Sequence, residues 1–516
     1  MAGVKIYRAT TALIGQVISL VSPVAAARYK AGREFYRSYT AGSLRDADRN
    51  FTPRLTSADS DIRKAWPLIT ARCRDQVENN PLISGAIERI CQNVVRNGIN
   101  PKFKFKTSAG VIDAAANAKW QESFRRWRRY CESTGHDTWK GVQRLVLRHL
   151  WSDGQCFAHR CFDFSIPGVN PLRLELLESD MLDPTVDGPQ ANGNLARKGI
   201  EYNSNGRPVT YHFLSHHPGD WVAWTTLKTR KIPAADIIHV WDRRRISQFS
   251  GIAWLAAVVM EAYRMEDFRH ITMDEARIQT IFGAFLRSTF PAFQLGQGMP
   301  LGGQATPTAA KTGATDAPTE ISSPMIQKLP SGTELQFTPT AHPGSQYEPF
   351  VKDSQRWQSA GLGMSFEGFA NNYTDSSYAS ARSGALEERL GYRGQQNVLD
   401  EQFCRDVYAW YIAADMLAGT APSPLPGYFK NPLLWHEAVE TGFPGWSWVD
   451  PTNDATASEK LIGMGLSTHA KQSAQHGEDF DMNVETLIEE ELKLTRLAEV
   501  RAARLKIESG QEANNV

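Results

Sequence analysis

Hydrophobic residues recur every three or four positions from residue 61 to residue 96, which predicts two consecutive amphipathic helices. The sequence Asn79-Asn80-Pro81 separates them, because proline lacks the backbone N–H that a continuing helix requires. The second helix is expected to end at Gly98. A third amphipathic segment covers Ala114 to Tyr130, so the chain after residue 60 begins with helices.

The third segment carries four arginines around one tryptophan, in the sequence Arg125-Arg126-Trp127-Arg128-Arg129. Such a cluster could clamp phosphate groups. It is also typical of a helix that buries its tryptophan and exposes its arginines to water. We favour the second interpretation.

Between residues 155 and 241 the hydrophobic pattern changes from helical spacing to alternation, which predicts a β-rich region. Asn205-Gly206 supplies the left-handed residues of a tight hairpin turn. The fold class is therefore α+β. The expected strands are Gln155 to Phe162, Leu172 to Leu177, Gly199 to Tyr202, Pro208 to Leu214 and Ile237 to Trp241.

The first of these strands contains a candidate metal motif, Cys156-x-x-His159-x-Cys161. Successive side chains of a strand point to opposite faces, so Cys156 faces away from His159 and Cys161. The three side chains cannot converge without a bulge, and we expect no zinc site from this set.

Two long helices are predicted in the second half of the chain, over Ala253 to Arg287 and over Tyr347 to Leu362. The first would be about 50 Å long, more than a compact core requires. Between them lies a segment rich in Pro, Gly and Thr, from Pro291 to Pro324, which we expect to be a flexible excursion. The pattern indicates a helical hairpin with a tip.

A Gly-, Asn- and Ser-rich loop follows from Gly363 to Ala379, and then a helical stretch from Ser380 to Met416. The stretch contains three glycines, which predict a kink or close packing against another chain: Gly384, Gly391 and Gly394. A helical tail begins after Trp446-Ser447-Trp448-Val449-Asp450-Pro451, and Glu489 is placed to pair with Lys493 in its last helix.

The charges of the chain nearly cancel: 57 Lys and Arg oppose 56 Asp and Glu among 516 residues, a formal net charge of +1. This balance argues against a strongly basic nucleic-acid coat protein. The cancellation is uneven, because residues 1–60 carry a net charge of +5 and residues 478–516 a net charge of −5.

The N-terminus leaves two interpretations open. Lys5 and Arg8 precede a mostly apolar run from Thr11 to Ala27, which resembles a signal peptide and would indicate an exported envelope protein. Polar residues and a proline interrupt the run, and the six cysteines show no disulfide spacing. We favour a cytoplasmic N-terminal arm, and we expect no membrane-spanning segment in the rest of the chain.

Motifs of catalysis are largely missing. The chain has no GxxxxGK[ST] loop, and the run that begins at His436-Glu437 has Glu440 where a metalloprotease helix needs its second His. Three carboxylates, Asp180, Asp183 and Asp242, could bind Mg²⁺ as a nuclease does, which we keep as the alternative function. We expect no enzyme activity, no cofactor and no metal.

Several short sequences, taken in their order, resemble the lambda-type portal proteins of tailed bacteriophages, over about residues 28 to 495. They are Arg72-Cys73-Arg74-Asp75 with Asn79-Asn80-Pro81, Ser152-Asp153-Gly154-Gln155-Cys156-Phe157, Gly199-Ile200-Glu201-Tyr202 with Gly206-Arg207-Pro208-Val209, Ile238-His239-Val240-Trp241-Asp242-Arg243, the run Tyr373 to Arg382, Trp446-Ser447-Trp448-Val449-Asp450-Pro451, and Gly465-Leu466-Ser467-Thr468.

This resemblance implies a ring of about a dozen copies at one vertex of a capsid, through which double-stranded DNA is packaged and ejected. It also implies contacts with the terminase large subunit, with major capsid or scaffold proteins and with head-tail joining proteins, and none with a membrane. The protein would reside in the virion after assembly in the host cytoplasm. The implied parts are a basic arm (1–60), a wing (61–250), a first stem helix (251–290), a clip (291–345), a second stem helix (346–362), a channel loop (363–379), a kinked spine helix with a return to the wing (380–450) and a helical crown (451–516).

The resemblance places the loop of residues 363–379 in the DNA path, and this loop contains no Lys or Arg. The loop offers Asn371, Asn372 and Tyr373 to DNA, and Lys352 and Arg356 are the nearest cations. These two cations would either follow the DNA backbone or form ion pairs between subunits. In the clip, three polar residues are the candidates for terminase docking: Lys328, Glu334 and Gln336.

Overall fold

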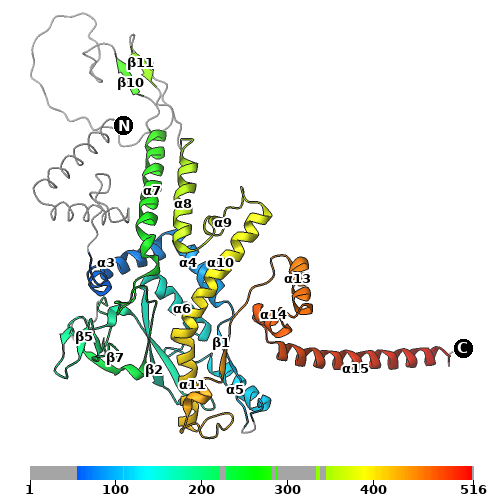
Figure 1. Ribbon diagram of the computed structural model, residues 1–516. Helices are drawn as coiled ribbons and strands as arrows, with labels where there is room; N and C mark the ends of the chain where they lie inside the picture. Colours follow the sequence, from blue (N-terminus) through cyan, green and yellow to red (C-terminus); the bar gives the residue numbers. More distant parts are fainter. Residues whose placement is uncertain are drawn as a thin grey trace, which may run out of the picture. The chain divides into compact units, whose positions relative to one another are not determined.

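The computed structural model describes residues 55–107, 110–220, 228–281, 285–288, 333–336 and 344–513. The chain divides into two units, Met1–Asp61 and Ile62–Val516, and the fold described below is that of the second (Figure 1). The signal-like run, most of the basic arm and the excursion of residues 291–324 lie outside the described residues.

The predicted helices of the first part are confirmed. Helix α3 (Ala58–Asn79) is followed by α4 (Pro81–Val95), with Asn80 between them. The Asn80 side chain accepts hydrogen bonds from the Leu82 and Ile83 backbone N–H groups, so the residue that interrupts one helix caps the next. Helix α5 (Ala114–Trp127) corresponds to the third predicted segment, whereas α6 (Trp139–Ser152) was not predicted.

The β-rich region consists of two antiparallel sheets. The first has the strand order β3-β2-β9 and comprises β2 (Gln155–Phe162), β3 (Leu172–Leu177) and β9 (Ile237–Trp241). The second has the order β4-β5-β6-β7-β8 and comprises β4 (Gly188–Pro189), β5 (Leu195–Arg197), β6 (Ile200–Tyr202), β7 (Pro208–Leu214) and β8 (Thr229–Pro233). The mixed helix and sheet content confirms the α+β class, and the short strands β4, β5 and β8 were not predicted.

The hairpin turn at Asn205-Gly206 is wider than predicted. Gly206 has φ +73°, whereas Asn205 is not left-handed. The Asn203 side chain accepts hydrogen bonds from the backbone N–H groups of Asn205 and Arg207, which holds the loop between β6 and β7. A side-chain cap therefore replaces the second left-handed residue.

The first long helix is shorter than predicted. A 3-10 turn, η6 (Trp254–Ala257), precedes α7 (Val259–Ile281), and Phe285–Ser288 forms strand β10. Strand β10 pairs with β11 (Thr333–Gln336), so a two-stranded ladder replaces the predicted end of the helix. The apolar residues at this end fit both a helix and a strand, and the pairing partner lies almost 50 positions away in sequence. The predicted return helix is confirmed as α8 (Tyr347–Leu362).

Helices α7 and α8 lie side by side (Figure 1). The Phe268 ring contacts the Phe350 ring at a centroid distance of 5.1 Å, and the Ser354 hydroxyl donates to Glu261 at 3.0 Å. At the base of the pair, a Cβ on Gly361 would lie 2.4 Å from Cγ2 of Val258. The hairpin inferred from the sequence is therefore a packed helix pair.

The glycine-rich helical stretch is irregular, although not at its glycines. Helix α10 (Tyr378–Leu399) runs regularly through all three glycines, a π-helical turn η7 follows at Asp400–Cys404, and α11 (Arg405–Ala418) continues the chain. At the turn, buried Asp400 accepts hydrogen bonds from Arg405 at 2.8 Å and Thr441 at 2.6 Å. The helical irregularity thus lies beyond Gly394.

The C-terminal part joins the body through a short strand and an ion pair. Helix α12 (Pro432–His436) precedes β12 (Val439–Gly442), which pairs with β1 (Asn100–Phe103). Helices α13 (Pro451–Gly463), α14 (His469–Gln475) and α15 (Phe480–Ala513) follow, and Lys102 pairs with Asp479 at 2.9 Å. The predicted Glu489–Lys493 pair is present at 3.5 Å.

Aromatic rings fill the centre of the main hydrophobic core. Trp120, Phe124 and Trp127 of α5 pack around Tyr411 of α11, with ring centroids 5.2–6.1 Å apart. This packing confirms that the arginine-flanked Trp127 is a core residue. Among the described helices, none is both long enough and apolar enough to cross a bilayer.

Candidate functional site

Residues 363–377 connect α8 to α10, and one glutamate fixes the start of this segment. Gly363 ends α8 with φ +69°, and Ser365 caps a short helix, α9 (Phe366–Ala370), through a 3.0 Å hydrogen bond from the Gly368 N–H. The Glu388 carboxylate on α10 accepts hydrogen bonds from the Ser365 backbone N–H at 2.8 Å and its hydroxyl at 2.5 Å. The predicted loop therefore contains a helix and is anchored to α10.

Two glycines allow this close approach. A Cβ at Gly384 would lie 3.3 Å from the Ser365 Cβ, and a Cβ at Gly368 would lie 2.5 Å from the Glu388 carboxylate. The glycines of α10 were expected to cause a kink or to pack against another chain. Helix α10 continues through these glycines, and Gly384 accommodates a neighbouring segment of the same chain; packing of the glycines against another chain stays a prediction.

The predicted residues Asn371, Asn372 and Tyr373 lie together at the end of α9. Asn371 adopts a left-handed conformation with φ +52° and ends the helix. The Asn372 side chain accepts hydrogen bonds from the backbone N–H and hydroxyl of Thr374 at 3.0 and 2.7 Å. Tyr373 is 56% exposed, so this turn presents uncharged polar groups and one aromatic ring to solvent.

Lys352 lies beside this turn with its charge opposed by two carboxylates. Its ammonium group pairs with Glu348 at 2.9 Å and with Asp375 at 3.0 Å. Hydrogen bonds to Glu348 and Asp375 raise the pKa of Lys352. These ion pairs are within one chain, whereas the sequence interpretation had considered only pairs between subunits. The i,i+4 spacing of Glu348 and Lys352 was a signal that could have revealed one of them.

Arg356, one turn further along α8, is exposed and lies over the Phe366 ring at 5.2 Å from its centroid. The sequence did not reveal that Glu388 anchors Ser365 or that Asp375 pairs with Lys352. It also did not reveal that Phe366 lies under Arg356. Their roles depend on the fold of residues 363–377 against two helices, which no local pattern reveals.

The three clip candidates are described only in part. Lys328 lies outside the described residues, whereas Glu334 and Gln336 belong to β11, opposite Arg287 and Phe285 of β10.

The carboxylates of the nuclease alternative have separate partners. Asp180 pairs with Arg74 at 2.6 Å. Asp183 is buried and accepts a 2.6 Å hydrogen bond from the Thr185 hydroxyl. It also accepts a hydrogen bond from the Thr229 hydroxyl. Asp242 lies 3.6 Å from Arg244. Asp183 and Asp242 belong to none of the groups of potential metal ligands among the described residues, so the nuclease alternative has no support.

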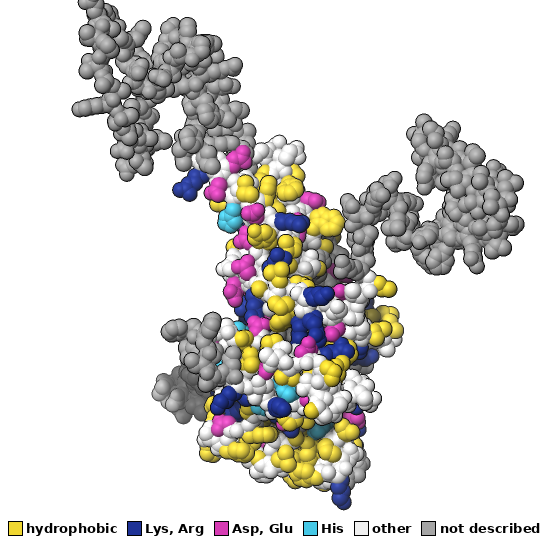
Figure 2. Space-filling model, turned by 90° about the vertical axis from the view of Figure 1, so that its left-hand side faces the viewer, with side chains coloured by type: hydrophobic (Ala, Val, Ile, Leu, Met, Phe, Trp, Pro, Cys, Tyr) yellow, Lys and Arg dark blue, Asp and Glu magenta, His cyan; other side chains and the backbone are white. Residues whose placement is uncertain are grey.

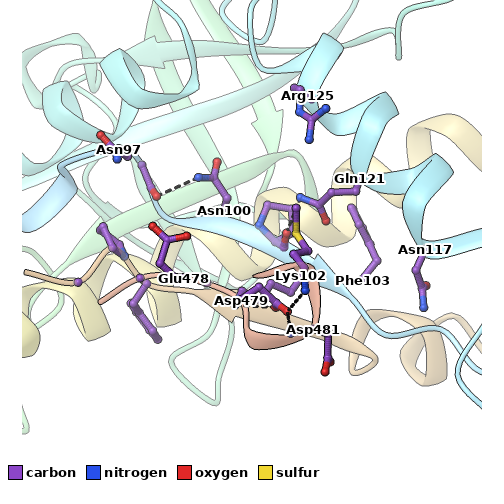
Figure 3. A pocket seen from close by; sticks show the side chains of 18 of the residues that line it. Asn97, Asn100, Lys102, Phe103, Asn117, Gln121, Arg125, Glu478, Asp479 and Asp481 are labelled. Carbon is purple, nitrogen blue, oxygen red and sulfur yellow. Dashed lines mark hydrogen bonds and ion pairs between the residues drawn. The ribbon is translucent and has the colours of Figure 1, made fainter. Parts of the chain in front are cut away.

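A cavity of about 970 Å³ lies between β1, α5 and the start of α15. Figure 3 shows Lys102 and Asp479 pointing toward each other within it, and Asn100 and Gln121 are also among the side chains that line it. Its lining mixes basic and acidic side chains, including Arg125 and Asp481. Arg125, one of the four clustered arginines, lines this cavity. It also pairs with Glu122 at 2.6 Å.

Comparisons with known proteins agree on one family. The model of the family described as "Phage portal protein, lambda family" matches residues 45–396. The chain is 25% identical to a probable portal protein of Halomonas phage phiHAP-1 over 422 residues, which cover 80% of this chain and 78% of that protein. It is 23% identical to the portal protein of Escherichia phage N15 and 22% identical to portal protein B of Escherichia phage lambda, in each case over 84% of this chain and 85% of the relative.

Among solved structures, a chain of the virion of a native gene transfer agent particle matches with a TM-score of 0.44 and 12% identity, over 80% of this chain and 93% of that chain. A chain of the neck of the native gene transfer agent particle, computed with C12 symmetry, matches with a TM-score of 0.43 and 12% identity, over 80% and 94% of the two chains.

Proposed function

The chain belongs to the lambda family of phage portal proteins, and from this premise we propose that it assembles into a ring at one capsid vertex and lets DNA pass during packaging and ejection. We infer that it is a structural component of the virion without an enzymatic step of its own. Assembly in the host cytoplasm is part of the same proposal.

One observation carries the more specific proposal that residues 363–379 face the DNA. This segment contains no Lys or Arg, and the nearest lysine, Lys352, is opposed by Glu348 and Asp375. Each cation that contacts a phosphate strengthens binding by releasing counterions, so a dense ring of cations would retain the DNA. Uncharged Asn371, Asn372 and Tyr373 would instead give weak contacts that a moving duplex can break.

The anchoring of the segment supports the same role. Glu388 holds Ser365, so the polar turn lies on a fixed base formed by α8 and α10. In this proposal Arg356 contacts the DNA less than the polar turn does, because its guanidinium already lies over the Phe366 ring.

Exposed hydrophobic side chains support association of copies through the α7–α8 pair. Tyr263, Ile271 and Met273 on α7 and Trp357 on α8 are each more than half exposed. Figure 2 shows hydrophobic, basic and acidic side chains intermixed over one face of the molecule, without a large area of a single charge. Such a mixed surface fits contact between identical copies better than a DNA-binding face.

The remaining parts follow the family layout as a proposal. The β-rich region and helices α3–α6 would form the wing, α7 and α8 the stem, β10 and β11 part of the clip, α10 and α11 the spine, and α13–α15 the crown. Glu334 and Gln336, with Lys328, would contact the terminase large subunit. Head-tail joining proteins and capsid or scaffold proteins would bind other parts of the ring.

Electron microscopy of the purified full-length protein tests the assembly. We expect ring particles with a central hole, and a monodisperse monomer at high concentration would contradict the proposal. The DNA path is tested separately by placing charge on the loop. Asn371→Lys and Asn372→Lys should leave the rings intact and slow DNA packaging in a reconstituted assay.

The matched control is Asn205→Lys, which adds the same charge to an exposed asparagine of the β6–β7 loop. Packaging should proceed normally in this variant. If the loop and control variants package DNA at equal rates, residues 363–379 do not face the DNA.

A further inference from the structure

Three chemically distinct side chains, all partly exposed, converge on one face of the β2–β3 ladder, namely His159, Cys161 and Glu175. The Glu175 carboxylate lies 2.8 Å from Nδ1 of His159, and Sγ of Cys161 lies 3.4 Å from the same nitrogen. The distance from Cys161 Sγ to the Glu175 carboxylate is 3.8 Å. Each residue offers one potential ligand atom, and these atoms all lie within 4.8 Å of one another.

The strand register explains the convergence. His159 and Cys161 are two residues apart on β2 and so share one face of the strand. Glu175 lies directly opposite His159 on β3. Cys156, the first residue of the C-x-x-H-x-C pattern, is buried on the other face, as the alternation predicted. The sequence motif therefore contributes two ligands, and the neighbouring strand contributes the third.

We propose that His159, Cys161 and Glu175 bind a Zn²⁺ ion, with water or another donor in the fourth position. Tetrahedral zinc with bonds of about 2.0 Å to nitrogen and oxygen and about 2.3 Å to sulfur spaces its ligand atoms by about 3.3–3.6 Å. The three measured separations, 2.8, 3.4 and 3.8 Å, bracket this range, so small side-chain movements suffice.

The contacts of the histidine argue against a nucleophilic cysteine. In a Cys–His–acid arrangement, the thiol and the carboxylate bind opposite nitrogens of the imidazole ring. Here Cys161 and Glu175 both contact Nδ1 of His159. Convergence of three donors on one point is the arrangement that a metal ion requires.

The surroundings of the site are compatible with a cation. Arg230 donates to the other oxygen of Glu175 at 3.0 Å, which orients the carboxylate and leaves one oxygen for the metal. Arg173, opposite Cys161 in the ladder, donates to the carbonyl oxygens of Asn170 and Leu172 and lies 3.6 Å from Asp163. With the thiolate and the carboxylate ionised, the three ligands would carry two negative charges to match Zn²⁺.

The site is reachable from solvent. The side chains of His159 and Glu175 are 20% and 28% exposed, and Cys161 is partly buried. The other described cysteines are buried, and burial raises the pKa of the thiols of Cys73, Cys91, Cys131, Cys156 and Cys404. Cys161 is therefore the accessible thiol among the described cysteines.

Metal binding by the full-length protein tests the proposal, with Zn²⁺ alone measured by calorimetry and Co²⁺ alone by absorption spectroscopy. We expect one equivalent of Zn²⁺ per chain, and a thiolate-to-cobalt charge-transfer band with the intense d–d bands of a tetrahedral ion. Cys161→Ala should abolish the charge-transfer band, and His159→Gln or Glu175→Gln should weaken Zn²⁺ binding by more than about tenfold.

The matched control is Cys156→Ala, which removes a thiol from the opposite face of the same strand and should leave both signals unchanged. Thermal unfolding of each metal-free variant shows whether it is folded. The proposal is overturned if the wild-type protein binds no stoichiometric Zn²⁺. It is equally overturned if the charge-transfer band persists in a folded Cys161→Ala variant or disappears in a folded Cys156→Ala variant.

Discussion

The guanidinium of Arg74 donates from Nε and Nη2 to the two carboxylate oxygens of Asp153, at 2.9 and 2.6 Å. Asp153 has a fully buried side chain, and Arg74 also pairs with Asp180 at 2.6 Å. The hydrogen bonding of Arg74 to the Asp153 carboxylate is the largest influence that raises the pKa of Arg74. This pair links helix α3 to the turn that leads into β2, and both residues belong to sequences that resemble the portal family.

Arg74→Met is expected to destabilise the protein by about 3–5 kcal/mol, because it leaves the buried Asp153 carboxylate without its positively charged partner and with only the hydrogen bond from the Ser152 hydroxyl. Urea denaturation monitored by tryptophan fluorescence measures the change. The matched control is Arg63→Met, which breaks a surface pair with Asp187 whose side chains are 39% and 36% exposed. That loss should be below about 1 kcal/mol. If both variants lose the same free energy of unfolding, the Arg74–Asp153 pair contributes no more to stability than a surface ion pair.

Gly154→Ala is expected to prevent correct packing of the turn before β2. Gly154 has φ +83°, and a Cβ there would lie 2.0 Å from the backbone carbonyl carbon of Ile252. Gly193 has nearly the same φ, +82°, and a Cβ there would meet no atom within 4 Å. Gly193→Ala should therefore cost only the backbone strain, about 1–2 kcal/mol.

Soluble yield and thermal unfolding distinguish the two glycine variants. We expect Gly154→Ala to be much the less stable, or insoluble, because backbone atoms cannot move away as a flexible side chain can. A Gly154→Ala protein as stable as the Gly193→Ala protein would contradict the close approach to Ile252.

Asp415→Asn is expected to stabilise the protein at neutral pH. Burial raises the pKa of Asp415 to about 6, and one of its carboxylate oxygens has no hydrogen-bond partner. A raised pKa means that the folded state binds more protons than the unfolded state between about pH 4 and pH 6, so the stability of the wild-type protein falls as the pH rises through this interval.

The gain from Asp415→Asn should be up to about 3 kcal/mol at pH 7 and about half as much at pH 5, since one pKa unit corresponds to about 1.4 kcal/mol. Urea denaturation of both proteins between pH 5 and pH 8 measures this difference. A gain that is independent of pH would mean that the carboxylate does not titrate in this interval.

Glu388→Ala is expected to release the start of the segment 363–377 from α10. The variant removes the acceptor of the Ser365 N–H and hydroxyl groups, so the amide of Ser365 should exchange with deuterium roughly tenfold faster or more. Hydrogen exchange followed by mass spectrometry measures this change. The control is Glu387→Ala, which removes an exposed neighbour on the same helix. Similar exchange in both variants would mean that Glu388 is not the anchor.

Local patterns in the sequence determined most helices and the longer strands. Signals within a few residues indicated the break between α3 and α4 at Asn79-Asn80-Pro81 and the burial of Trp127. They also indicated helix α8 and the strands β2, β3, β7 and β9. The order of several short motifs also indicated the family, which the comparisons confirmed. The predicted C-terminal end of the first long helix was wrong, because residues there form strand β10, which pairs with the distant strand β11.

The sequence alone thus determined most helices and the longer strands, the family and the lack of cations between residues 363 and 379. Only the tertiary structure decided which charges meet: Lys352 with Asp375, Arg74 with Asp153, and His159 and Cys161 with Glu175. Periodicity arises from contacts between near neighbours in the chain, so it can be recognised in the sequence. Charge pairing and ligand convergence depend on distances between residues far apart in sequence, and those distances are set only when helices and strands pack.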